Sequence, residues 1–98
     1  MKIVINKCYG GFSLSKEAYK FLGLEWDGYG YAYDRGDNTR HNEKLIACVE
    51  ALGEKASGDC ANLGVVEIPD NATDWRIDEY DGYESIIAVV NGKMIDIY

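Results

Sequence analysis

The sequence is poor in the residues that build catalytic and metal centres. Its 98 residues include one histidine, His41, which excludes a metal site built from several histidines. The three cysteines, Cys8, Cys48 and Cys60, are odd in number and lack C-x-x-C spacing, which predicts free thiols in a reducing compartment. We therefore expect no catalytic residue set, no metal and no cofactor.

Long hydrophobic runs are also missing. No segment approaches the roughly 20 apolar residues that cross a bilayer. The apolar stretch after Met1 is too short for the core of a signal peptide. The length suits one domain over residues 1–98. These features predict a single-domain cytoplasmic protein that does not contact a membrane.

Positive charge is scarce. The chain has 10 Lys and Arg against 17 Asp and Glu, a formal net charge of −7. Residues 1–44 carry seven cations and six anions, a net charge of +1, whereas residues 45–98 carry three and eleven, a net charge of −8. Because nucleic-acid binding depends on neutralising phosphates, this balance argues against a direct nucleic-acid partner. The near-neutral first half still permits a small anionic ligand.

The N-terminal segment predicts a strand followed by a capped helix. Lys2–Asn6 has an apolar centre, which is typical of a central strand. Ser15 is placed to cap a helix that Gly23 ends. Three residues of this helix are expected to face the core: Ala18, Phe21 and Leu22.

The middle of the chain is expected to hold a strand, a loop and a second helix. Aromatic residues alternate at 29, 31 and 33 as in a strand. Polar residues dominate 34–42, which predicts a loop. Asn42 can cap a helix from Glu43 to about Ser57, weakened in its last turn by Gly53.

The C-terminal part is expected to be mostly strand. Apolar or alternating segments lie at 63–68, 75–80 and 85–90. Asn91-Gly92 predicts a tight hairpin between 86–90 and 94–98. The element order indicates an α+β domain with two helices packed on one face of a mostly antiparallel sheet of about five strands.

A glycine loop between the first strand and the first helix is the best site candidate. Backbone amides at such a loop can converge on an anion. The alternative is a tight turn whose glycines only satisfy a positive φ. A phosphate or nucleotide cradle would use these residues: Lys7, Gly10, Gly11, Phe12, Ser13 and Ser15.

Aromatic and arginine residues near this loop extend the candidate site. Arg35 or Arg40 can form a forked contact with a phosphate. A purine could stack on these aromatic residues: Tyr29, Tyr31 and Tyr33, with Tyr9 and Phe12. Arg40 lies just before the expected second helix, whose end could share the anion. The alternative is that the tyrosines fill a core or an interface.

Several segments resemble one group of short proteins found in bacteriophages, prophages and gut metagenomes. The likeness lies in an N-x-C-[FY]-G-G-F-x-L-S motif at Asn6–Ser15 and in residues 49–58, 65–70 and 77–82. Members of the group carry a longer insertion where this chain has Glu25–Thr39, and a basic, aromatic end where it has Asn91–Tyr98. The resemblance implies a phage setting, in which small acidic proteins often disarm bacterial immunity.

Two binding functions remain open at this point, and a small hydrolase that uses Cys8 or the carboxylates is a third alternative. One is a phage counter-defence protein, acting in the infected host cytoplasm, that sequesters a nucleotide-derived immune signal without cleaving it. The other is a stoichiometric inhibitor of an immune effector protein, of the anti-CRISPR kind, whose acidic residues 67–84 mimic nucleic-acid charge. In either case the small size and the C-terminal strand predict a homo-oligomer, most simply a dimer.

Overall fold

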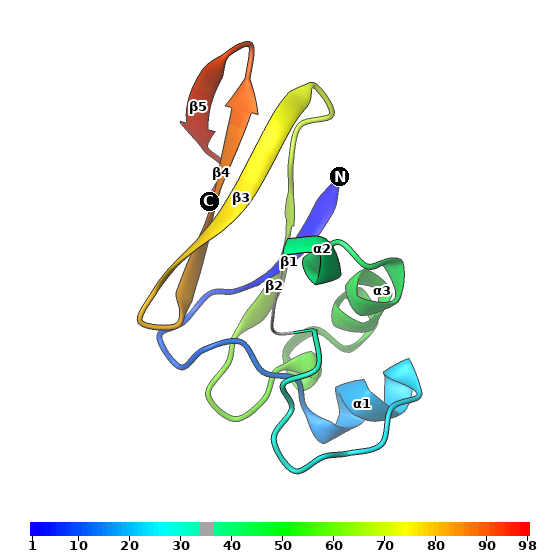
Figure 1. Cartoon of the computed structure of the whole chain (residues 1–98). Helices are drawn as coiled ribbons and strands as arrows, with labels where there is room; N and C mark the ends of the chain where they lie inside the picture. The colour runs from blue at the N-terminus through cyan, green and yellow to red at the C-terminus, as the bar shows by residue number, and fades with distance from the viewer. Residues whose placement is uncertain (34–36) are drawn as a thin grey trace.

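The protein is built in three layers, seen in a computed structural model that describes residues 1–33 and 37–98 (Figure 1). The elements in chain order are β1 (Lys2–Asn6), α1 (Lys16–Leu22), α2 (Asp37–Arg40), α3 (Glu43–Leu52), a 3-10 helix (Gly53–Ala56), β2 (Leu63–Glu67), β3 (Ala72–Tyr80), β4 (Tyr83–Val90) and β5 (Lys93–Asp96). The predicted α+β class is confirmed. The strands form two antiparallel sheets, β1–β2 and β3–β4–β5, where we expected one.

Two hairpins build the three-stranded sheet. β3 and β4 meet at Asp81-Gly82, and β4 and β5 meet at Asn91-Gly92. The φ angles of Asn91 and Gly92 are 52° and 76°, the positive values that a two-residue hairpin turn requires. The hairpin predicted from Asn91-Gly92 is therefore confirmed.

The signals at both ends of α1 are also confirmed. The Ser15 hydroxyl accepts a hydrogen bond from the Ala18 amide, and Gly23 adopts a left-handed φ of 74°. The Leu24 amide then donates to the Tyr19 carbonyl, which completes a Schellman stop. The expected core face is wrong at one position: Phe21 is 49% exposed, because the helix turns Ala18 and Tyr19 inward instead.

The second predicted helix is shorter than expected. α3 begins after its Asn42 cap and ends at Leu52, because Gly53 has a φ of 57° that breaks the helical path. A 3-10 turn over Gly53–Ala56 follows. No helix among the described residues combines the length and the apolar composition that crossing a membrane requires.

The strand expected at residues 29–33 does not form. Gly28, Gly30 and Tyr33 have φ angles of 86°, 85° and 63°, which are incompatible with an extended strand. The segment is an irregular loop instead. A short helix, α2, occupies part of the region that we expected to be a loop.

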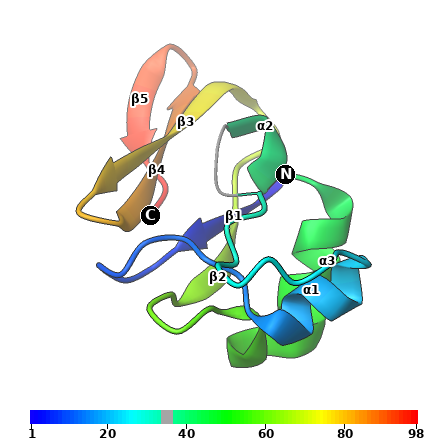
Figure 2. The ribbon, with the colours of Figure 1, turned by 60° about the horizontal axis from the view of Figure 1, so that its bottom comes forward.

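β1 lies between the helices and the three-stranded sheet (Figures 1 and 2). It supplies residues to an apolar cluster on each side. Val4 packs with Leu45 and Val49 of α3 on the helical side. Ile3 and Ile5 pack with the three-stranded sheet on the other side, against Ile86 and Ala88 among others. Burial on both faces explains why the strand is a continuous apolar run. The central position predicted for this strand is wrong, because among the described strands β1 pairs with β2 alone in a two-stranded sheet.

A buried ion pair occupies the edge of β1 that faces away from β2. In the β1–β2 register, Val4 and Asn6 turn their backbone groups toward that edge. The Val4 carbonyl accepts from Arg40 Nη1 at 3.3 Å, and the Asn6 amide donates to Glu84 Oε1 at 2.8 Å. Arg40 and Glu84 also bind each other through two contacts of 2.5 and 2.8 Å. Side chains thus satisfy backbone groups that a neighbouring strand would otherwise pair.

Glu84→Gln should destabilise the protein strongly. The change removes the negative charge that makes two contacts with the Arg40 guanidinium, which is 3% exposed. Loss of one partner of a buried pair costs about 3–5 kcal/mol, so we expect a decrease of that size in the free energy of unfolding, measured by urea denaturation.

Glu79→Gln is the matched control for this variant. Glu79 lies directly opposite Glu84 on β3, but it is exposed. Its free energy of unfolding should change by less than about 0.5 kcal/mol. Equal, small losses in the two variants would contradict a structural role for the ion pair.

Candidate functional site

A groove of about 1050 Å³ runs along the glycine loop. Its lining comes from three parts of the chain that are distant in sequence, with two carboxylates added from the β3–β4 hairpin. These residues are 10–17, Trp26, Gly28, Tyr29, Tyr31, Lys55, 57–60, Glu79 and Glu84. The volume is at the upper end of the range for small-molecule sites.

The two glycines of the loop have different structural roles. A Cβ on Gly10 would lie 1.7 Å from the Cys60 carbonyl oxygen, so Gly10 allows two backbones to pack closely. Gly11 has a φ of 92° and open space at its Cβ position, so it provides the turn itself. Among the described residues, the Phe12 and Ser13 amides donate no hydrogen bond. These amides are the loop donors that a ligand could use.

Ser13 and Ser15 hold the loop in place. The Ser15 hydroxyl caps α1 and donates to the Lys55 carbonyl at 2.5 Å. The Ser13 carbonyl accepts from the Gly58 amide at 3.0 Å. Both contacts join the glycine loop to the segment after α3, which explains how residues 55–60 reach the groove.

An Asp27 turn shapes the aromatic wall. One carboxylate oxygen accepts from the Tyr29 and Gly30 amides at 2.8 and 2.9 Å. The other accepts from the Tyr19 hydroxyl at 3.0 Å. The bonds from the Gly30 and Tyr29 amides hold the pKa of Asp27 below its ordinary value. This turn holds the loop that carries Tyr29 and joins it to α1 through Tyr19.

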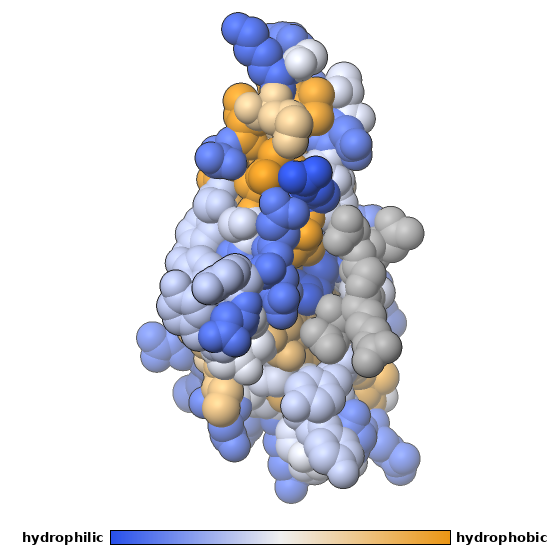
Figure 3. Space-filling view, turned by 60° about the vertical axis from the view of Figure 1, so that its left-hand side comes forward, coloured by the Kyte–Doolittle hydropathy of each residue, from blue (hydrophilic) through white to orange (hydrophobic). Residues whose placement is uncertain are grey.

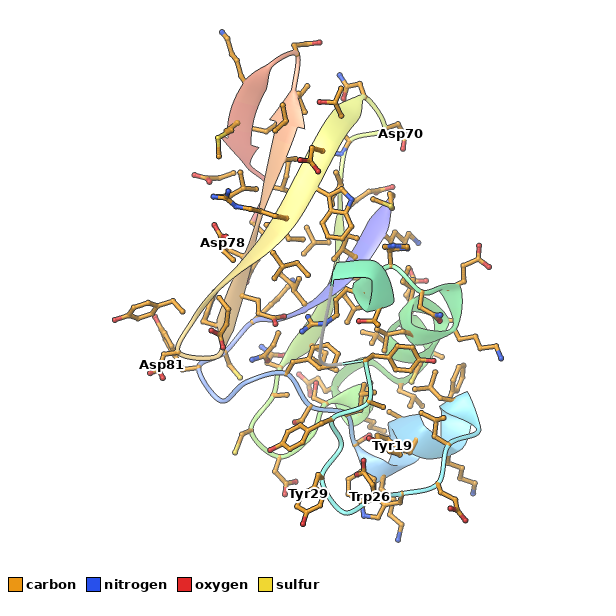
Figure 4. All side chains as sticks on the ribbon, viewed as in Figure 1. Tyr19, Trp26, Tyr29, Asp70, Asp78 and Asp81 are labelled. Atoms are coloured by element: carbon orange, nitrogen blue, oxygen red, sulfur yellow. The ribbon has the colours of Figure 1, made fainter. Side chains whose placement is uncertain are left out.

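The aromatic side chains of this wall lie at one end of the molecule (Figure 4). The Trp26 ring packs edge-on against Tyr19, with 5.0 Å between ring centroids. Tyr29 and Tyr31 stack at 6.2 Å with an interplanar angle of 10°. Tyr29 and Tyr31 are 72% and 60% exposed, so their faces are accessible to a planar ligand.

The charge along the groove is mixed. Lys16 and Lys55 supply ammonium groups, whereas Glu17, Asp59 and Glu79 supply carboxylates. The Glu84 carboxylate is already bound by Arg40. The lining thus has more carboxylates than ammonium groups, which argues against a polyphosphate ligand.

Arg40 is not placed where we expected a phosphate. Its guanidinium is buried against Glu84, donates to the Tyr33 carbonyl at 3.0 Å and lies 3.8 Å from the centroid of the Phe12 ring. The role predicted for Arg40 in anion binding is therefore replaced by a structural one, because folding uses its donors internally. Arg35 lies outside the described residues.

Lys7 and Tyr9 do not line the groove. The Lys7 ammonium sits 4.8 Å from the Tyr98 ring centroid. Tyr9 packs against Tyr83 with ring centroids 5.2 Å apart. The other predicted residues, Gly10, Gly11, Phe12, Ser13, Ser15 and Tyr31, all line the groove.

Sequence reasoning missed the contributions of Trp26, Lys55 and residues 57–60. Only tertiary hydrogen bonds bring 57–60 to the loop, and the one local signal was Gly58. A Cβ at Gly58 would lie 2.1 Å from the Ser13 hydroxyl oxygen, so this glycine marks a close approach.

The cysteines and acidic residues give no metal centre within residues 1–33 and 37–98. Burial raises the pKa of the Cys48 thiol, and Cys8 Sγ donates to the Cys60 carbonyl at 2.9 Å.

Comparison with family models, curated proteins and solved structures finds no match to this chain. The resemblance to phage proteins therefore stays a prediction.

Asp27→Asn should remove a pH dependence of the aromatic wall. The pKa of Asp27 is lowered in the folded state, so the carboxylate stabilises the turn at pH values above the ordinary Asp pKa of about 3.9. That stabilisation is lost as the pH falls through the lowered pKa that Asp27 has in the folded protein. In a Trp75→Phe background, Trp26 fluorescence should change over this acid range, and Asp27→Asn should abolish the change.

Asp59→Asn in the same background is the control and should keep the transition. Far-ultraviolet circular dichroism at each pH separates the local change from global unfolding. Identical fluorescence titrations with and without the Asp27 carboxyl would contradict its role in holding the wall.

Proposed function

We propose that this protein binds a nucleotide-like small molecule in the groove and sequesters it without cleaving it, as a phage counter-defence protein in the cytoplasm of the infected bacterium. The observation that carries the proposal is the juxtaposition of the glycine loop with the exposed aromatic wall. This pairing offers backbone donors and ring faces to one ligand.

Each part of the groove suits a different part of a nucleotide. The exposed faces of Tyr29 and Tyr31 can stack a base, an interaction of about 1–3 kcal/mol. The amides of Phe12 and Ser13 can donate to a phosphate oxygen, and Lys16 or Lys55 can add a charged hydrogen bond. These are binding contacts, and the proposal assigns no group to a chemical step.

Tyr29→Ala combined with Tyr31→Ala should weaken binding of such a ligand. With ADP-ribose as the probe, we expect the dissociation constant to rise roughly ten- to a hundred-fold, measured by titration calorimetry. ADP-ribose released by heat from the wild-type protein should be chromatographically unchanged.

Tyr80→Ala is the matched control, because Tyr80 is 78% exposed and lies outside the groove. It should leave the affinity unchanged. Equal weakening by this control, or the absence of binding of AMP, ADP-ribose and cyclic di-AMP to the wild-type protein, would refute the nucleotide proposal. A hydrolysed product would move the protein to the enzyme class.

The second candidate function is stoichiometric inhibition of a bacterial immune effector protein. The observation that favours it is the exposed acidic character of the β3–β4 hairpin, where Asp74 and Asp81 are exposed and Asp78 is half-buried. Such a surface can occupy a basic channel that normally takes nucleic acid. This function needs no ligand in the groove.

We also propose self-association through the edge of β5. The Ile97 amide bonds to the Ile86 carbonyl, so alternate residues of β5 bond to β4. Met94 and Asp96 therefore turn their backbone groups outward. An antiparallel copy that pairs Met94 with Asp96 of the second chain would satisfy both and bring the two Ile95 side chains together.

Met94→Pro should abolish this self-association. Proline removes the outward Met94 amide without removing a bond to β4, whereas Met94→Ala keeps that amide. Sedimentation at micromolar concentration should show twice the 11.0 kDa chain mass for the wild type and Met94→Ala, and a monomer for Met94→Pro. A monomeric wild type would rule the dimer out.

A further inference from the structure

Among the described residues, no helix or strand packs on the outer face of the β3–β4–β5 sheet, and Tyr9 contacts Tyr83 at one end of it. One face of β4 is buried: Ile86 and Ala88 pack against β1, and Glu84 pairs with Arg40. Because side chains alternate along a strand, the intervening residues of β4 point to the opposite side. The register extends this opposite face to its neighbours on β3 and β5. Figure 3 shows this side as a hydrophobic stripe over β4 and β5 that is bordered by hydrophilic residues.

Apolar and aromatic side chains form the centre of this face. Ile87 and Val89 of β4 lie beside Met94 of β5, which is 62% exposed. Tyr83 continues the row and stacks on Tyr98 with ring centroids 6.4 Å apart. Aromatic and methionine residues are the types enriched at the centres of protein interfaces.

Carboxylates border the apolar centre on both sides. Asp74 and Asp78 of β3 lie across from Val89 and Ser85, and Asp96 of β5 lies across from Ile87. Within the three described strands, the register places one cation on this face, Arg76. Its Nε lies 3.1 Å from Asp78, so the pair is locally neutral. The remaining charge that these strands place on the face is negative, and the Lys7 ammonium lies over the Tyr98 ring at one end of it.

We propose that this face, formed by Asp74, Arg76, Asp78, Tyr83, Ile87, Val89, Met94, Asp96 and Tyr98, docks a protein partner whose contact surface has an apolar centre and an arginine-bearing rim. The apolar row supplies the area removed from water. The carboxylates orient the partner and select a cationic rim. Arginine fits because its guanidinium forms bidentate contacts with carboxylates and stacks on exposed tyrosines.

A second copy of the chain fits this face less well. Face-to-face packing of two copies would bring acidic rims together, and like charges at an interface cost free energy. Charge complementarity therefore favours binding of a cationic partner to this face over binding of a second copy. The face is also separate from the groove: none of its nine residues lines the groove.

The experiment is a titration of the ¹⁵N-labelled full chain with a ten-residue peptide of alternating arginine and leucine. Chemical-shift changes should concentrate on β3–β5 outer-face residues. Asp74→Asn combined with Asp96→Asn should weaken peptide binding at least five-fold, and Met94→Ser should weaken it as well. Glu25→Gln combined with Glu54→Gln makes the same change in net charge at exposed positions elsewhere and should leave the affinity within two-fold.

Two results would overturn the proposal. One is equal weakening by the two charge-matched pairs, with shift changes spread over all acidic residues, which would mean attraction by net charge alone. The other is concentration-dependent shift changes at Arg76, Asp78 and Ile87, away from the β5 edge, without peptide, which would assign the face to a second copy. A peptide of alternating lysine and leucine that binds as tightly as the arginine peptide would contradict the claim that the face recognises the arginine guanidinium.

Discussion

The Arg40–Glu84 ion pair is the interaction on which the arrangement of layers depends. β1 is buried on both faces, yet it has a strand on only one edge. An unpaired buried backbone group costs about 1–3 kcal/mol, and the edge facing β4 presents the Val4 carbonyl and the Asn6 amide. Arg40 donates a hydrogen bond to the Val4 carbonyl, and Glu84 accepts one from the Asn6 amide. The two side chains also bind each other as an ion pair. Two sheets can therefore pack through side chains where one continuous sheet would otherwise be required.

The same pair supports one wall of the groove. Phe12 of the glycine loop lies over the Arg40 guanidinium, and Asn6 donates to the Cys8 and Gly82 carbonyls on either side. A Cβ at Gly82 would lie 2.5 Å from the Gly11 amide nitrogen, so the β3–β4 turn rests directly on the loop. The opposite wall is held mainly by the Asp27 turn. We expect the glycine loop to be the stiffer side of the groove and the aromatic wall to adjust to a ligand.

The groove and the outer sheet face offer different chemistry at separate places. The groove has mixed charge and accessible rings, which suits a small planar ligand of modest charge. The sheet face has an apolar row with an acidic border, which suits a folded partner. The uneven charge of the chain follows this division, because the groove is lined mostly by the N-terminal half and the sheet is built from the acidic half.

Local signals in the sequence determined the elements whose causes are local. Ser15, Gly23, Asn42 and Asn91-Gly92 each set a cap or a turn through their own backbone and side-chain atoms, and the apolar run of β1 indicated a buried strand. Six of the ten predicted site residues also line one groove. Tertiary structure decided the rest. The alternating tyrosines at 29–33 resemble a strand, but a carboxylate at Asp27 and positive φ angles at Gly28 and Gly30 bend them into a loop. Arg40 had the chemistry of a phosphate ligand, and only the approach of Glu84, 44 residues away, made it part of the core. The residues adjacent to Arg40 in the sequence do not indicate such a contact. Its free energy arises only when folding buries two segments that are distant in the sequence against each other.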